Sequence, residues 1–226
     1  MVKNILFLKL SLKQLIVSGI HIGNSKDSFN NQIKPYLFGY YYLFFIINLY
    51  YTNFQLKIIL QLITKLTFLR QKLFFVKCSG FGSMVDQFSK LRVNNLFFYN
   101  FTWIGGFLTN FKEVRNHWLK KDLRLKITDK LKLTLHQRTS LTELIFFPSL
   151  IIFFDNYSLD AIQEVNRVDI PIVGIIDTNS SHLNLLNYLI VGNNSSYGSL
   201  FLYYNLFYNS IKIGLQKENF TVLSLK

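Results

Sequence analysis

Residues 171–177 read PIVGIID, a short apolar run that ends in an aspartate. The apolar side chains follow one another without alternation, which is typical of a strand buried on both faces of a parallel sheet. Similar runs recur along the chain and predict further buried strands. These lie at residues 44–49 (FFIINL), 73–78 (LFFVKC), 96–99 (LFFY), 150–155 (LIIFFD) and 188–191 (YLIV).

Segments with helical spacing or capping signals separate most of these runs. Ser11, Thr52 and Ser158 each precede such a segment and can accept a hydrogen bond from its first turn. Ser195 or Ser196 can do the same for the last helix. The expected helices cover residues 11–17, 52–69, 83–92, 158–167 and 196–215, and residues 19–39 are expected to form a loop. Alternating strands and helices predict an α/β fold with a parallel sheet between two helical layers.

One region interrupts this alternation. No strand is expected between residues 110 and 145, and nine Lys and Arg residues occur from Lys112 to Arg138. We interpret residues 110–145 as a helical insertion whose first helix is capped by Thr109 or Asn110. The length of the chain is compatible with one large domain, and we expect residues 1–226 to form a single domain that carries this insertion.

Charge is distributed unevenly. The net charge is +13, and residues 1–147 hold 21 basic and 6 acidic side chains, whereas residues 148–226 hold 4 and 6. This asymmetry favours a polyanionic partner for the first two-thirds of the chain. Lys and Arg side chains suit contacts to phosphates. The residues expected to bind RNA are Lys26, Lys34, Lys112, Arg115, Lys120, Lys121 and Arg124.

The composition excludes several classes of protein. A single cysteine rules out an intramolecular disulfide framework and a cysteine-based zinc cluster. Half of the residues are hydrophobic, but the longest apolar window, residues 36–54, contains Gly39 and Asn48. A spanning helix needs about 20 predominantly apolar residues, so no membrane span is expected.

The choice of residues points to an A/T-rich genome. Ala161 is the only alanine, and 19 Lys accompany 6 Arg. No folding principle requires this bias, whereas the favoured residues have A/T-rich codons. We interpret it as mutational pressure of the kind found in an organelle genome.

Signals for catalysis are weak. The chain has no P-loop and no G-x-S-x-G motif, and residues 79–83 (SGFGS) are its only phosphate-loop-like stretch. Asp155 and Asp177 end strands at the carboxyl edge of the expected sheet, where α/β active sites lie. Two such aspartates could hold Mg²⁺, but capping of the following loop is the commoner role. We expect no metal, no cofactor and no enzymatic activity.

Several segments together resemble one family. They are residues 19–23 (GIHIG), 34–39 (KPYLFG), 46–49 (IINL), 103–110 (WIGGFLTN), 170–180 (IPIVGIIDTNS) and 192–195 (GNNS). In order and spacing they are similar to the universal small-subunit ribosomal protein number two, in its bacterial and organellar form. The motif residues that the resemblance singles out are Gly19, His21, Gly23, Trp103, Gly105, Gly106, Asn110, Pro171, Asp177 and Asn179.

The resemblance implies a flavodoxin-like three-layer α/β/α sandwich with a parallel sheet and a helical-hairpin insertion, here shortened. It implies a structural role in translation, with small-subunit rRNA and neighbouring ribosomal proteins, including organelle-specific ones, as partners. Asn24, Asp27 and Ser28 stand where the family carries basic or His residues. Such losses fit a divergent mitochondrial ribosome better than a plastid or bacterial one.

Two other classes remain as alternatives. A flavodoxin-like enzyme that binds a nucleotide or flavin would need a phosphate-binding loop after its first strand, and residues 50–52 (YYT) do not form one. A polytopic membrane protein is disfavoured by the interrupted apolar runs.

Overall fold

The computed structural model describes residues 10–76, 95–99, 103, 105–110, 113, 147–154 and 158–224. Five parallel strands form its main sheet: β4 (Leu73–Val76), β5 (Leu96–Tyr99), β6 (Leu150–Phe153), β7 (Ile172–Ile176) and β8 (Tyr188–Val191). Their spatial order is β5-β4-β6-β7-β8. Numbered within this sheet alone, that is the order 2-1-3-4-5 of flavodoxin-like folds. The predicted fold class is therefore confirmed.

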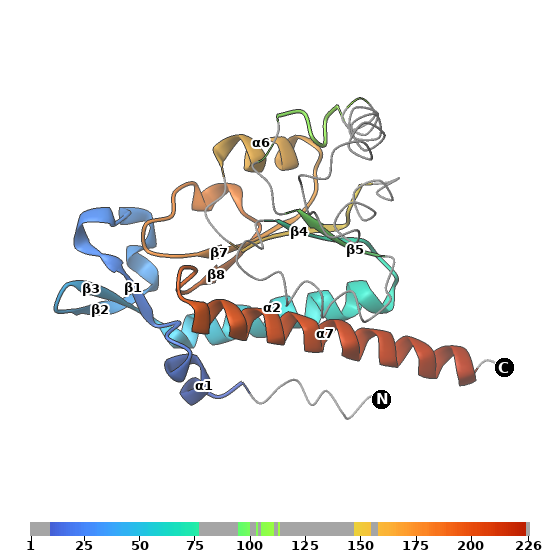
Figure 1. Cartoon of the computed structure of the whole chain (residues 1–226), viewed down its shortest axis with the longest axis horizontal. Coiled ribbons are helices and arrows are strands. Elements are labelled where there is room, and N and C mark those ends of the chain that lie inside the picture. The colour runs from blue at the N-terminus through green and yellow to red at the C-terminus, as the bar shows by residue number, and fades with distance from the viewer. Residues whose placement is uncertain are drawn as a thin grey trace, which may run out of the picture.

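Helices cover both faces of this sheet (Figure 1). The helices α2 (Leu49–Phe68) and α7 (Tyr197–Ser224) lie together on one face, and α6 (Leu159–Arg167) lies on the other. Alternate side chains of β4 enter two separate apolar cores: Phe75 packs with residues of α2 and α7, and Phe74 packs with residues of α6. Strands buried on both faces need apolar side chains at every position, which explains the unbroken runs in the sequence.

The two long helices approach closely at a glycine. A Cβ on Gly214 of α7 would lie 2.8 Å from the backbone oxygen of Thr64 in α2. Near this point the Thr64 hydroxyl donates to the carbonyl of Ser210 at 3.2 Å. The small residue therefore lets the backbones of α2 and α7 pack against each other.

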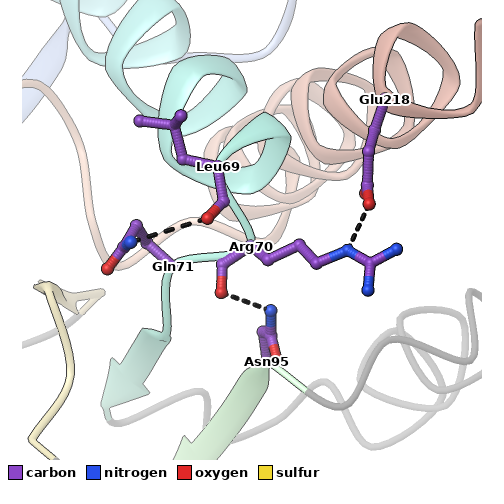
Figure 2. A network of polar contacts seen from close by, with 5 residues as sticks. All are labelled: Leu69, Arg70, Gln71, Asn95 and Glu218. Atoms are coloured by element: carbon purple, nitrogen blue, oxygen red, sulfur yellow. Dashed lines mark hydrogen bonds and ion pairs between the residues drawn. The ribbon is translucent and has the colours of Figure 1, made fainter. Parts of the chain in front are cut away.

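A polar network fixes the end of α2 (Figure 2). The guanidinium of Arg70 pairs with the carboxylate of Glu218 on α7. The carbonyl of Arg70 accepts a hydrogen bond from the side-chain amide of Asn95 at 2.5 Å, just before β5. Gln71 accepts from the hydroxyl of Ser149 at 2.7 Å, just before β6. The turn after α2 thus connects both long helices to the start of two strands.

A second, smaller sheet precedes α2. The strands β1 (Ile22–Ser25), β2 (Leu37–Tyr41) and β3 (Phe44–Ile47) pair antiparallel in the order β1-β3-β2. The short 3₁₀ helices η1 (Lys26–Ser28) and η2 (Asn31–Tyr36) connect β1 to β2, and α1 (Leu12–Val17) precedes them all. In Figure 1 this sheet lies beside one edge of the main sheet.

This small sheet corrects two predictions. Residues 44–49 were expected to form a buried parallel strand, but β3 belongs to the antiparallel sheet. Residues 19–39 were expected to form a loop, yet they contain β1 and most of β2. Accordingly, the first parallel strand is β4, and the phosphate-loop-like residues 79–83 that follow it lie outside the described residues.

Helix boundaries agree with the sequence at some ends and differ at others. Ser11 and Ser158 cap α1 and α6 as expected. By contrast, α2 begins three residues before Thr52, with Asn48 as its N-cap. The hydroxyl of Thr52 instead donates to the carbonyl of Val191 at 2.6 Å. At the other end, α7 continues past the expected residue 215 to Ser224.

Two expected elements, the helix at residues 83–92 and most of the insertion at residues 110–145, lie outside the described residues. Among the described helices, none combines the length and the apolar character needed to cross a bilayer.

Candidate functional site

Three of the sequence motifs meet at the carboxyl edge of the main sheet. The backbone N–H of Asn193 donates to the carbonyl of Ile20 at 3.0 Å, and its side chain donates to that of Ile22 at 2.8 Å. The N–H of Asn24 donates to the hydroxyl of Thr178 at 2.7 Å. We call this region, residues 19–24, 176–180 and 192–194, the motif junction. It attaches the small sheet to the ends of β7 and β8.

Glycines make the close contacts of the motif junction possible. Gly19 follows α1 with a φ of +76°, a conformation that favours glycine. A Cβ on Gly23 would lie 2.4 Å from the Thr178 methyl group, so a side chain there would force the two segments apart. The structure therefore places Gly23 against Thr178, the residue that follows Asp177, and Gly19 against Ser196 at the start of α7.

Asp177 is the buried charge of the motif junction, with 1% of its surface exposed. Its Oδ1 accepts from the backbone N–H of Thr178 at 2.6 Å, whereas its Oδ2 has no hydrogen-bond partner among the described residues. Burial raises the pKa of Asp177. Burial, followed by the charge of Asp177, raises the pKa of Tyr203 well above its usual value. The Asp177 carboxylate therefore accepts hydrogen bonds from the first residue of the turn that follows β7.

Of the two strand-end aspartates, only Asp177 lies in the described part of the chain. Asp155 lies outside the described residues. Within them, no group of three or more His, Cys, Asp or Glu side chains could hold a metal ion.

The second cluster centres on Glu164, a carboxylate buried on α6. Glu164 Oε2 accepts from the indole N–H of Trp103 at 2.8 Å and from the N–H of Gly106 at 3.1 Å. Glu164 Oε1 accepts from the N–H groups of Leu108 and Thr109 at 2.6 and 3.0 Å. One side chain therefore organises residues 103–109, the turn that leads to the insertion.

The backbone of this turn needs its second glycine. Gly106 has a φ of +81°, and its carbonyl accepts from the N–H of Asn110 at 2.8 Å. The side chain of Asn110 donates to the carboxylate of Glu113 at 2.5 Å. Gly105 is exposed and faces open space. The left-handed conformation that favours glycine is therefore found at Gly106 and not at Gly105.

Sequence reasoning missed Glu164, although a signal for it exists. Ala161, Ile162 and Val165 form the buried face of α6, and Glu164 lies on the same face at helical spacing. A charged residue placed among apolar ones on a helix face must find partners once it is buried.

A comparison with known protein families matches the chain over most of its length. The family model for ribosomal protein S2 matches residues 15–214, a range that includes the motif junction and the Glu164 cluster. The chain belongs to the ribosomal protein S2 family.

Individual relatives agree with this assignment. Small ribosomal subunit protein uS2 of Wigglesworthia glossinidia brevipalpis is 29% identical over 223 residues, which cover 91% of this chain and 92% of the relative. The uS2 protein of Buchnera aphidicola subsp. Cinara cedri (strain Cc) is 31% identical over 216 residues, with coverages of 86% and 88%. That of Blochmanniella pennsylvanica (strain BPEN) is 30% identical over 222 residues, with coverages of 90% and 96%. The expected class, a ribosomal protein and not an enzyme, is confirmed.

The residues expected to bind RNA in this S2-family chain lie in two regions. Lys26 begins η1, where its ammonium sits 3.9 Å from the centre of the Tyr40 ring, and Lys34 is exposed in η2. Lys112, Arg115, Lys120, Lys121 and Arg124 lie outside the described residues, so their assignment stays a prediction. Two other motif residues, one outside and one inside the motif junction, make none of the junction contacts described above. Pro171 lies at the opposite end of β7, where its carbonyl accepts from Ile151, and Asn179 is exposed in the turn after β7.

The raised pKa of Asp177 predicts a pH effect on the stability of this S2-family fold. Because the folded state holds the Asp177 proton more tightly than the unfolded state, the contribution of Asp177 to stability falls as pH rises from about 4 through the raised folded pKa. Asp177→Asn keeps an oxygen for the Thr178 N–H and carries no charge. We expect the variant to be at least as stable as wild type at pH 8, with a shallower decline from acid to neutral pH.

Urea unfolding at several pH values measures this effect. The matched control is Asp169→Asn, an exposed residue in a turn with a φ of +55°, which asparagine also adopts. A decline as steep in Asp177→Asn as in wild type would contradict the assignment.

Proposed function

We propose that this chain is a structural component of the small ribosomal subunit, where it binds small-subunit rRNA and neighbouring ribosomal proteins. The observation that carries the proposal is the family match over residues 15–214. The concentration of positive charge in residues 1–147 supports an RNA partner, since 21 basic side chains there face only 6 acidic ones. In this proposal residues 1–226 form one domain, and the insertion at residues 110–145 is its principal RNA-binding element.

The insertion is proposed to contact the RNA backbone. Lys112 and Arg115 are three residues apart, so they share one side of a helix, and Arg124 adds a further positive charge to the insertion. Such contacts to phosphates are independent of sequence and weaken as salt rises. Glu164 supports this arrangement because it holds the turn from which the insertion departs.

The salt dependence of subunit binding tests this proposal. The triple variant K112A/R115A/R124A is expected to bind small subunits or their rRNA more weakly. The log–log slope of affinity against salt should be flatter by roughly one unit for each phosphate that the variant no longer binds. The matched control R167A/K212A/K217A removes the same charge from residues 148–226. An unchanged salt slope in K112A/R115A/R124A would show that the RNA contacts lie in another part of the chain. A wild-type chain that fails to sediment with small subunits would reject the whole proposal.

We also propose that the ribosome is mitochondrial and that organelle-specific proteins contact this chain. The support is compositional: one alanine, 23 Phe, and 19 Lys against 6 Arg fit an A/T-rich organelle genome. The relatives named above are bacterial, so the compartment needs its own test. Peptides of this chain should be recovered by mass spectrometry from purified mitochondrial small subunits of the source organism. Recovery only from plastid ribosomes, or from bacterial cells, would contradict the proposal.

A further inference from the structure

One face of the small sheet contacts the main domain at Gly23, and the opposite face turns away from the main domain. Gly23 on β1 faces inward, against Thr178 of the main domain. Its neighbour Ile22 points the opposite way, because successive side chains of a strand alternate. The strand register extends this open surface across all three strands. It consists of Ile22, Ile46 and Gly39 in one row and of Phe44 and Tyr41 in the next.

This outer face, defined by Ile22, Gly39, Tyr41, Phe44 and Ile46, is apolar and accessible. Ile22 is 40% exposed, Phe44 47% and Tyr41 66%. Large apolar side chains gathered on one accessible face commonly mark an interaction site. Tyrosine and phenylalanine are also enriched in the buried centres of protein interfaces.

Gly39 leaves an open position in this face. A Cβ built on Gly39 would meet no atom within 4 Å. Nor does Gly39 have the positive φ that requires glycine. The register of β2 against β3 shifts between Leu37 and Gly39, and glycine within a strand often marks such a β-bulge. The missing side chain also leaves room above the sheet for another backbone to approach closely.

The charges around the outer face favour a protein over RNA. No Asp, Glu, Lys, Arg or His occurs between Lys34 and Lys57, a stretch that includes all of β2 and β3. The ammonium of Lys26 rests on the ring of Tyr40, a residue that alternates with Gly39 and Tyr41 and so points to the inner side. RNA binding relies on cations that contact phosphates, and the outer face supplies none. Its neutrality instead matches an uncharged, apolar peptide.

The edge of the sheet offers a second element of recognition. Among the described strands, β2 pairs only with β3, so β2 is an edge strand of the small sheet. Edge strands of natural proteins are often protected by lysine or proline, and β2 (LFGYY) contains neither. An added peptide can therefore reach both the edge of β2 and the space above Gly39.

We propose that the outer face docks an apolar, uncharged segment of a neighbouring small-subunit protein, laid along β2 with a side chain or backbone seated over Gly39. The proposal deepens the proposed function, on which it rests, by naming one protein-binding surface and the chemistry of its partner.

Photo-crosslinking in assembled small subunits tests it. A benzoyl-phenylalanine replaces Tyr41 in the full chain, which is assembled into subunits and irradiated. We expect a crosslink to another subunit protein that resists nuclease and is lost on protease treatment, with an apolar, uncharged crosslinked peptide. A crosslink to rRNA, to a second copy of this chain, to a charged peptide or to nothing would overturn the proposal.

The variant Gly39→Val separates docking from folding. Valine fits open space and favours strands, so the thermal stability of the free chain should be unchanged or higher. Its side chain would occupy the proposed docking position, and the yield of the Tyr41 crosslink should fall about tenfold, which corresponds to a loss of about 1.4 kcal/mol. An unchanged yield would overturn the proposal. If wild type does not enter small subunits at all, the proposed function itself fails, which is a distinguishable result.

Discussion

Replacing Glu164 with alanine is expected to cost about 3 kcal/mol of unfolding free energy or more, since each buried donor left without an acceptor costs about 1–3 kcal/mol. The donors are the Trp103 indole and the backbone N–H groups of Gly106, Leu108 and Thr109. Alanine offers them no oxygen, and Leu108 is fully buried, so water has little access to its N–H group. Urea unfolding followed by circular dichroism measures the loss.

Two further variants make this result specific. Glu164→Gln keeps one carbonyl oxygen but turns an amide group toward the donors. We therefore expect its free energy of unfolding to lie between those of wild type and Glu164→Ala. Gln163→Ala changes the exposed neighbour on α6 and should stay within about 0.5 kcal/mol of wild type. If Glu164→Ala were as stable as Gln163→Ala, the hydrogen bonds around Glu164 would not hold the turn.

The main sheet could be predicted from sequence because the patterns that mark its strands depend on residues close together in the chain. Strands β4, β6 and β7 are buried at every position and show unbroken apolar runs. The caps Ser11 and Ser158 were visible for the same reason, since capping depends on residues within one turn. These features need no knowledge of distant contacts.

The small sheet was missed because its turn carries no ordinary turn residue. Tyr42 and Leu43 form the two-residue loop between β2 and β3, and Tyr42 has a φ of +53°. Such loops usually contain Gly, Asn or Asp, so the residues around Tyr42 read as one apolar run. The apolar pattern of β3 also could not distinguish a buried parallel strand from an antiparallel one that exposes aromatic side chains.

The Glu164 cluster and the motif junction depend on contacts that the sequence alone does not give. Glu164 meets Trp103 across 61 positions of the chain, and Asn24 meets Thr178 across 154. The motifs indicated which residues matter, but the closeness of each contact, and hence the need for glycine, appears only in three dimensions.

Gly192→Ala tests the packing of the motif junction where space is tightest. Its N–H donates to the carbonyl of Ile176 at 2.8 Å, and an added Cβ would lie 2.1 Å from the hydroxyl oxygen of Tyr203. Tyr203 is fully buried, so its ring has little room to move. Overpacking of this kind costs about 1–3 kcal/mol, and we expect a loss near the upper end in urea unfolding.

The hydroxyl of Tyr203 decides whether this explanation is correct. It has no hydrogen-bond partner among the described residues, so Tyr203→Phe alone should be neutral or slightly stabilising. In the double variant with Gly192→Ala, removal of the hydroxyl relieves the shortest contact of the new methyl group, whereas the contact with Ile20 Cγ2 at 2.8 Å remains. We therefore expect the pair to lose at least about 1 kcal/mol less than the sum of the single effects. Tyr204→Phe removes a hydroxyl from the next residue of α7, whose ring stacks on Phe154, and should give no such rescue. Equal rescue by both changes, or by neither, would show that the loss in Gly192→Ala does not arise from the contact with the Tyr203 hydroxyl.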